Sequence, residues 1–166
     1  MSSPQPTQHR STLGICEQML TFTVGREIYG VDILCVQEIR GWSPPTSVPH
    51  AAPHILGVIH LRGSIIPILD LRLRFELGPP EYNAMTVIVV LTVQSASGPV
   101  EVGVVVDSVQ EVVNFDEASL RPAPNLGRDP QTEFVKGLLP IGNHMVVLLD
   151  VERLIGLQVP QMARVA

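Results

Sequence analysis

Two stretches of this sequence, GVIHLRGSIIPILDLRLRF at residues 57–75 and GLLPIGNHMVVLLDVERLI at residues 137–155, align without a gap when the chain is shifted against itself by 80 positions. The nineteen aligned pairs include three identities and nine matches between apolar residues. In each stretch, two apolar runs flank a short pair of turn residues, Arg62-Gly63 in the first and Gly142-Asn143 in the second. This pattern is typical of a β-hairpin with a two-residue turn.

A second echo lies outside these stretches, where VQEI at residues 36–39 resembles VQEV at residues 109–112 at an offset of 73. Two interpretations stay open. Hairpins with similar turns can resemble one another through composition alone, or the chain can hold two related small β-barrels in tandem. We favour the second, because the nine apolar matches exceed the roughly four that a composition of 45% apolar residues would give by chance. Valine and isoleucine supply 35 residues, and glycine and proline interrupt the apolar runs at short intervals, which is typical of short strands.

The composition is unusually apolar. Of the 166 residues, 45% are hydrophobic and only 16% are charged, and the mean hydropathy is +0.28. The longest uninterrupted apolar runs, Val87–Leu91 and Met145–Leu149, are five residues each, whereas a membrane-spanning helix needs about 20. A small barrel buries only about 60% of the surface of its chain. We therefore expect two barrels that share a third apolar layer and leave apolar surface for a protein partner.

The charges and cysteines narrow the class further. Sixteen acidic residues oppose eleven basic ones, ten arginines and Lys136, for a net charge of −5. The basic residues form no cluster that could neutralise a row of phosphates, which disfavours nucleic-acid binding. The first 12 residues lack the charged start and apolar stretch of a secretory signal, so we expect a cytoplasmic protein. Two cysteines are too few for a disulfide framework.

The domain boundaries follow from the hydrophobic periodicity. Residues 1–14 and 160–166 lack it, and we expect them to be disordered tails. Residues 15–159 then form one domain of two β-barrel subdomains. We assign them roughly to the first and the second half of the chain, with strand exchange at the N-terminus left open.

The sequence offers no clear catalytic or metal-binding group. The spacing of His50, His54 and His60 suggests metal ligands, but a proline precedes each of the first two, which disfavours the helix that would align them. No nucleophile elbow, phosphate-binding loop or dinucleotide motif is present. We therefore expect no enzyme, no cofactor and no metal. Four aspartates stand where a strand gives way to a helical turn, which aspartate ordinarily caps: Asp32, Asp70, Asp116 and Asp150.

One strand carries a candidate interaction surface. If Ile39 faces inward, the alternation of a strand places Val36, Glu38 and Arg40 together on the outer face. An exposed valine beside a charged pair favours a protein contact, and we expect exposed apolar residues to gather around Val36 and the groove between the two barrels. Arg62, at a hairpin tip, presents a planar guanidinium either to a partner or to its own loop. The sequence leaves these two roles of Arg62 open.

At these positions the chain resembles the CheW family of bacterial chemotaxis coupling proteins. The likeness runs in order from about residue 18 to residue 156. It rests on FTVG (22–25), YGVDILCVQEIRG (29–41), LRG (61–63), PILDLR (67–72), RPAP (121–124) and TEF (132–134).

The resemblance implies an all-β fold of two SH3-like five-stranded β-barrels packed together, with short helical turns. It also implies a non-enzymatic adaptor that couples the cytoplasmic tip of methyl-accepting chemotaxis receptors to the regulatory domain of the histidine kinase CheA, in arrays at the membrane. Receptor-binding roles would fall on Val36, Glu38, Gly57, Arg62 and Gly63. A kinase- or receptor-facing role would fall on Val87, Glu111 and Val112.

Two features depart from the family pattern. His60 stands where the family usually has asparagine, and the hairpin at residues 95–99 is longer than in close relatives. The rival hypothesis is a small-ligand-binding or hydrolytic β-barrel protein, which would need a concave apolar pocket with convergent polar groups.

Overall fold

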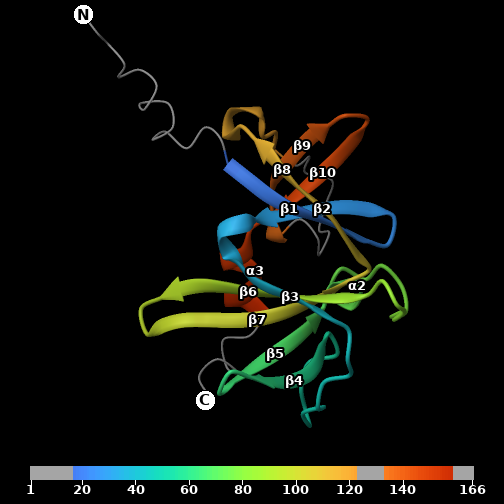
Figure 1. The fold of residues 1–166 in the computed structure, drawn as a ribbon, viewed down its shortest axis with the longest axis vertical. Coiled ribbons are helices and arrows are strands. Elements are labelled where there is room, and N and C mark those ends of the chain that lie inside the picture. Colours follow the sequence, from blue (N-terminus) through green and yellow to red (C-terminus); the bar gives the residue numbers. More distant parts are fainter. Residues whose placement is uncertain (1–16, 123–132, 159–166) are drawn as a thin grey trace, which may run out of the picture.

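The computed structural model describes residues 17–122 and 133–158, which form two five-stranded sheets stacked on one another (Figure 1). The tails expected at residues 1–14 and 160–166 lie outside the described residues. The elements are β1 (Glu17–Val24), β2 (Glu27–Asp32), η1 (Ile33–Cys35), β3 (Val36–Gly41), β4 (Ile55–Leu61), β5 (Ser64–Asp70), α2 (Leu71–Arg74), β6 (Val87–Ser95), β7 (Gly98–Val106), β8 (Ser108–Phe115), η2 (Glu117–Ser119), β9 (Val135–Ile141), β10 (His144–Leu149) and α3 (Val151–Gln158).

The two sheets do not divide the chain into a first and a second half. Sheet A has the order β8-β1-β2-β10-β9, and sheet B has the order β3-β6-β7-β5-β4. The β1–β2 hairpin of the first half joins β8, β9 and β10 of the second half in sheet A. The β6–β7 hairpin of the second half joins β3, β4 and β5 of the first half in sheet B. This exchange is reciprocal and interlocks the two barrels, so neither sheet is built from one half alone.

The internal repeat predicted from the sequence is confirmed by the strand registers. The offset of 80 converts the β4–β5 hairpin into β9–β10, since the pair Leu61 and Ser64 corresponds to Ile141 and His144. The offset of 73 converts β2 and β3 into β7 and β8. Both sheets also share one parallel pairing in which a strand passes a glycine, Gly30 in sheet A and Gly103 in sheet B.

Each barrel closes through a backbone bridge that lies beside a glycine, Gly57 in sheet B and Gly137 in sheet A. In sheet B, the segment after β3 pairs with β4 through reciprocal backbone hydrogen bonds of 2.9 and 2.8 Å between Thr46 and Val58. A Cβ on the neighbouring Gly57, which has φ +149°, would lie 2.0 Å from the carbonyl oxygen of Thr46. Gly137 takes the same place in sheet A, beside the bridge between Arg121 and Leu138. Gly57 is therefore buried and shapes the backbone instead of offering a contact surface.

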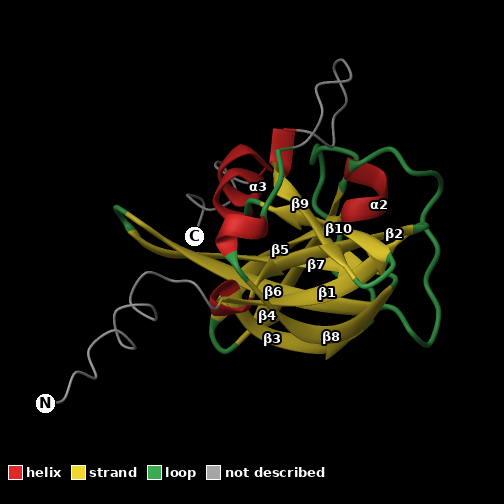
Figure 2. Cartoon of the chain, turned by 90° about the horizontal axis from the view of Figure 1, so that it is seen from above, coloured by secondary structure: helices red, strands yellow, loops and turns green. Residues whose placement is uncertain are grey.

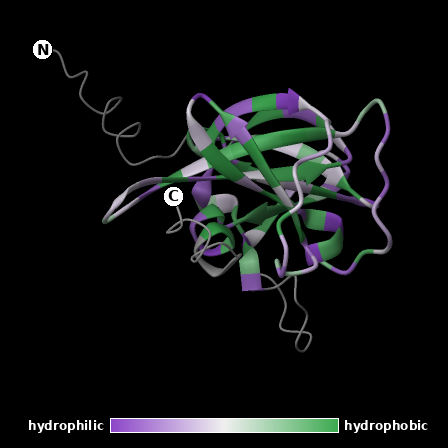
Figure 3. Ribbon diagram, turned by 90° about the horizontal axis from the view of Figure 1, so that it is seen from below, coloured by the Kyte–Doolittle hydropathy of each residue, from purple (hydrophilic) through white to green (hydrophobic). Residues whose placement is uncertain are grey.

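The apolar residues form three layers, one inside each barrel and one between the barrels. Seen from above and from below, the strands carry the hydrophobic residues and lie over one another (Figures 2 and 3). The shared layer is the largest and draws on both sheets and both α-helices. Its aromatic members Phe22, Tyr29, Phe75 and Phe134 follow one another with ring centroids 5.4 to 6.3 Å apart. The third layer expected from the composition is present.

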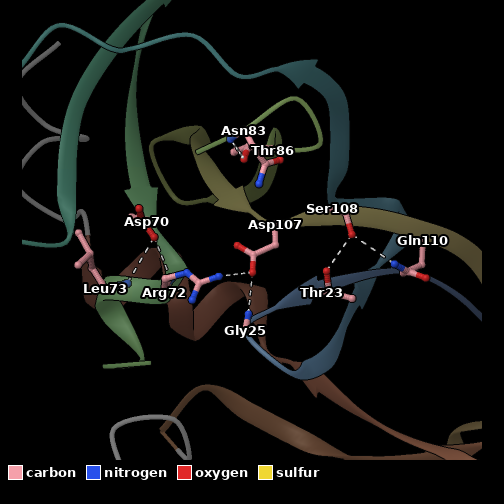
Figure 4. Close-up of polar contacts among 10 residues, drawn as sticks. All are labelled: Thr23, Gly25, Asp70, Arg72, Leu73, Asn83, Thr86, Asp107, Ser108 and Gln110. Atoms are coloured by element: carbon pink, nitrogen blue, oxygen red, sulfur yellow. Dashed lines mark hydrogen bonds and ion pairs between the residues drawn. The ribbon is translucent and has the colours of Figure 1, made fainter. Parts of the chain in front are cut away.

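A polar junction ties the two barrels together where β7 crosses into β8 (Figure 4). The Oδ2 atom of Asp107 accepts a hydrogen bond from the backbone N–H of Gly25 at 2.8 Å and another from the guanidinium of Arg72. Beside it, the hydroxyls of Thr23 and Ser108 share a hydrogen bond of 2.8 Å. Because one carboxylate meets the β1–β2 turn and α2 at once, the orientation of the barrels is fixed by this junction as well as by the shared layer.

Aspartates cap the short helices as the sequence predicts. The carboxylates of Asp32 and Asp116 accept the N–H two residues further on, and that of Asp70 accepts those of Arg72 and Leu73. Asp150 accepts the N–H of Arg153 at 3.1 Å. No helix in the described part of the chain is long and apolar enough to span a membrane.

Candidate functional site: the two barrel ends

A β-bulge decides which way the side chains of β3 point. The register against β6 skips a residue between Val36 and Glu38, so Val36 and Ile39 face the same side. On this side Val36 packs against the shared apolar layer, whereas Ile39, further along the strand, is 45% exposed. The expectation that Val36 shares one face with Glu38 and Arg40, opposite a buried Ile39, is therefore wrong. Simple alternation cannot detect an extra residue in a strand.

The closed end of the sheet B barrel is the charged cluster of Glu38, Arg40, Arg62 and Glu101. Arg62, from the β4–β5 turn, donates to one carboxylate oxygen of Glu38, and Arg40 donates to the other at 3.2 Å. The second guanidinium nitrogen of Arg62 lies 3.9 Å from Glu101 on β7. Arg62 thus reaches across the barrel end and joins the β4–β5 turn to two strands, β3 and β7.

The turn geometry explains how Arg62 takes this position. Arg62 and Gly63 have φ +53° and +82°, which is the two-residue hairpin turn that the sequence predicts. Half of the Arg62 side chain stays exposed, at 49%, and about a quarter of the Glu38 side chain, at 27%. Arg62 therefore braces Glu38 while about half of its own side chain stays exposed.

The arginines also set the charge of Glu38. Hydrogen bonding from Arg62, and then from Arg40, lowers the pKa of the Glu38 carboxyl below its usual range. The carboxylate is therefore charged at neutral pH, and the closed end presents two guanidinium groups and two carboxylates.

The open end is the corresponding end of the sheet A barrel, where a pocket of about 220 Å³ lies. Glu111 on β8 corresponds to Glu38 at the offset of 73, and its backbone N–H and C=O are both bonded to the hydroxyl of Thr21, at 3.1 and 2.7 Å. Val112, beside it, is 46% exposed. The pocket is lined by Thr21, Ile28, Gln110, Glu111, Val113, Ile141, His144 and Val146.

The other predicted site residues differ in accessibility. Gly63 is exposed at the hairpin tip beside Arg62, whereas Gly57 is buried under the backbone of Thr46. Val87, at the start of β6, is half-buried against the shared layer. Glu38, Arg62 and Gly63 thus come together at the closed end, while Glu111 and Val112 lie at the open end.

Four exposed apolar residues occur in matched pairs, and of these the sequence predicted only Val112 as a site residue and missed Ile39, Ile65 and Met145. Ile39 and Val112 are 45% and 46% exposed, and they correspond at the offset of 73. Ile65 and Met145 are 59% and 47% exposed, and they correspond at the offset of 80. Leu34 and Ile39, which are 86% and 45% exposed, lie on either side of Val36 in the sequence, but Val36 itself packs against the shared layer. The internal repeat could have found these pairs, since it aligns both of them.

The structure brings no metal-binding cluster together in residues 17–122 and 133–158. His50 and His60 are exposed, and His54 contributes its carbonyl oxygen to the N–H of Asp70 at 2.9 Å.

Comparisons with known proteins agree with this architecture. Residues 18–159 match the family of CheW-like domains. The chain is 41% identical to the chemotaxis protein CheW of Klebsiella aerogenes over 139 residues, which cover 84% of this chain and 81% of that protein. It is 35% identical to the probable chemotaxis protein CheW of Rhizobium etli over 137 residues, 82% of this chain and 86% of that protein.

A solved structure shares the fold. The scaffolding protein TtCheW of Thermoanaerobacter tengcongensis matches with a TM-score of 0.70 and 30% identity, over 80% of this chain and 83% of that one. The two-barrel, all-β fold expected from the resemblance is confirmed. By its sequence across both sheets and by its fold, the chain belongs to the CheW-like domain family.

Proposed function

We propose that this chain is a non-enzymatic, cytoplasmic chemotaxis scaffold that is recruited to receptor arrays at the membrane and couples methyl-accepting receptors to the histidine kinase CheA. The observation that carries the proposal is the likeness to chemotaxis CheW proteins over more than four-fifths of this chain and of the relatives compared. The fold supports the proposal because the two barrels have ends with the same backbone geometry but different side chains, which suits two different partners.

A bridging role needs one body that holds two partners in a fixed relation. The reciprocal hairpin exchange and the Asp107 junction supply such a body. A change in one partner then moves the other without a large change inside the scaffold. The coupling can be no larger than the difference in affinity between the signalling states.

We assign the receptor to the closed end. Glu38, Arg62 and Gly63 form its accessible surface, and Val36 and Gly57 support that surface from beneath. The kinase then docks at the open end, on Glu111 and Val112. Val87 packs against the shared apolar layer and contributes to binding indirectly, by supporting the packing between the two barrels.

The small-ligand alternative gains no support from the pocket. Pockets for small molecules usually measure about 300 to 1,000 Å³, and this one measures about 220 Å³.

The direct test is capture of purified CheA and of a receptor cytoplasmic fragment on the immobilised chain. Retention of both, singly and together, is the expected result. Retention of neither would overturn the proposal.

Charge reversal separates the two roles of Arg62. Glu38→Lys and Arg62→Glu should each weaken receptor capture about tenfold, because each breaks the ion pair and reverses a surface charge. The double variant restores the pair with opposite polarity. If Arg62 only braces Glu38, the double variant recovers capture; if either group touches the receptor, capture stays weak. Glu81→Lys, an exposed site with the same change of charge, is the matched control.

If Glu38→Lys captures the receptor as well as the control does, the closed end is not the receptor surface. Kinase capture should be unchanged in all four variants.

A further inference from the structure

The open end keeps the acidic residue of the closed end but loses the arginines that neutralise it. Glu111 corresponds to Glu38, and both lie beside a β-bulge in the same register. Arg40 is replaced by Val113 and Arg62 by Gly142, according to the same offsets. No basic side chain of the described residues forms an ion pair with Glu111.

The second carboxylate of the closed end is also absent here. Glu101 of the closed end corresponds to Ile28, so the open end has one carboxylate at its mouth and an apolar wall behind it. Thr21, whose hydroxyl bonds both backbone groups of Glu111, holds the bulge in place. The result is a preformed pocket instead of an ion-pair cluster, in the place that a guanidinium occupies in the other barrel.

We propose that the open end receives an arginine side chain of the kinase, whose guanidinium pairs with Glu111 as Arg62 pairs with Glu38. This inference rests on the proposed function, because the closed end is there assigned to the receptor. The volume suits one side chain better than a separate small molecule. A guanidinium matches a carboxylate with two parallel hydrogen bonds, and Gln110 and His144 line the same pocket as further polar groups.

The rim of the open end favours a protein as the source of the arginine. Val112 and Met145, 46% and 47% exposed, lie next in sequence to the lining residues Glu111 and His144 and point to the outer faces of the same strands. An arginine anchored in a small pocket with apolar contacts around it is a common centre of protein interfaces.

The chain itself supplies the variant that tests this inference. Gly142→Arg places in sheet A the residue that sheet B has at the same turn position. Gly142 has φ +61° and Arg62 has φ +53°, so the turn accommodates arginine. The new side chain should reach Glu111, fill the pocket and weaken kinase capture at least about tenfold, with receptor capture unchanged. Gly142→Asn, which tolerates positive φ and is too short to reach Glu111, is the matched control.

A second variant isolates the charge from the space. Glu111→Gln keeps the pocket open and removes the carboxylate, and it should also weaken kinase capture about tenfold. A crystal structure of Gly142→Arg should show the guanidinium within about 4 Å of the Glu111 carboxylate. Thermal melting of each variant confirms that the fold is kept.

The outcomes are distinguishable. If the unmodified chain captures neither partner, the proposed function fails. If it captures the kinase and both variants do so equally well, the function stands and the inference is overturned. If Gly142→Arg weakens capture but Glu111→Gln does not, the kinase covers the open end without an arginine pair, which also overturns it. If the variants abolish only self-association of this chain in sedimentation, the arginine comes from a second copy and the kinase assignment is wrong.

Discussion

The closed end and the open end share a backbone geometry, but charged side chains fill the closed end and a pocket lies at the open end. Both lie beside a bulged strand that carries glutamate, Glu38 or Glu111, and beside a two-residue turn. In one barrel an arginine from that turn fills the space, and in the other a glycine leaves it empty. The two ends therefore share their backbone geometry, while different side chains at a few matched positions give each its own chemistry. Such a pair can hold two different partners on one small domain.

The comparison also shows which interactions close the barrels, the backbone bridges or the ion pair at the barrel end. The ion pair of Arg62 with Glu38 is half exposed, and exposed ion pairs contribute only about 0 to 1 kcal/mol. Sheet A has no counterpart of this pair and is closed all the same. Both barrels share the backbone bridge beside a glycine, at Thr46 in sheet B and at Arg121 in sheet A. Closure depends on the glycines and the bridges.

The largest expected effect breaks that shared closure. Gly57→Ala should destabilise the protein by about 3 to 4 kcal/mol, because φ +149° is strained for alanine and the new Cβ would meet the carbonyl oxygen of Thr46. Gly137→Ala should cost less, about 2 kcal/mol, since the φ of Gly137 is not in the strained region and its Cβ would meet the side chain of Leu120 at 2.5 Å and the carbonyl oxygen of Arg121 at 2.9 Å, against 2.0 Å for the carbonyl oxygen at Gly57.

Urea unfolding of the two variants measures the difference. Equal losses would show that the positive φ and the closer backbone contact of Gly57 add nothing to the cost. A larger loss for Gly137→Ala would contradict the argument. Circular dichroism below the transition checks that both variants keep their strands.

The next effect compares the helix caps that follow the two hairpins. Asp70 is 2% exposed and accepts the hydroxyl of Tyr82 at 2.6 Å in addition to two N–H groups of α2. Asp150, its counterpart, is partly exposed, and the structure gives its side chain one bond, from Arg153. Asp70→Ala should cost about 3 kcal/mol and Asp150→Ala about 1 kcal/mol.

Thermal and urea unfolding of both variants provide the measurement. Tyr82→Phe is a useful third variant. It removes only the hydrogen bond from the tyrosine hydroxyl, so it should lose part of the stability that Asp70→Ala loses. Similar losses for the two aspartates would show that the tyrosine bond contributes nothing to the difference.

Much of this fold was predictable from the sequence. The hairpins, the capping aspartates and the repeat follow from local patterns of apolar residues, turn residues and spacing. The reciprocal exchange of β1–β2 and β6–β7 is different, because it depends on which sheet each hairpin joins. That choice is made by packing in the shared layer, and no local pattern along one strand records it. The change of offset from 73 to 80 locates the repeat but does not say which sheet receives each part.

The candidate site was predicted only in part, and for a similar reason. Glu38, Arg62 and Gly63 meet as expected, since a turn and a strand end are visible in the sequence. The bulge at Gln37 reversed the side of Val36, and the burial of Gly57 came from the segment around Thr46, which is distant in sequence from β4. Both depend on contacts between segments.

The smallest expected effect tests the charge of the closed end. Because Arg62 and Arg40 lower the pKa of Glu38 in the folded state, the charged carboxylate favours folding above the pKa that glutamate has in the unfolded chain, about 4.3. That contribution is lost as the pH falls through the lowered folded-state pKa. The stability difference between the unmodified chain and Glu38→Gln should therefore shrink in acid. In an Arg62→Gln background the difference should be smaller at neutral pH and change less with pH, because the first cause of the shift is gone. Carbon NMR of the Glu38 carboxyl in both backgrounds gives the pKa directly, and a pKa that does not rise when Arg62 is replaced would show that the ion pair does not form in solution.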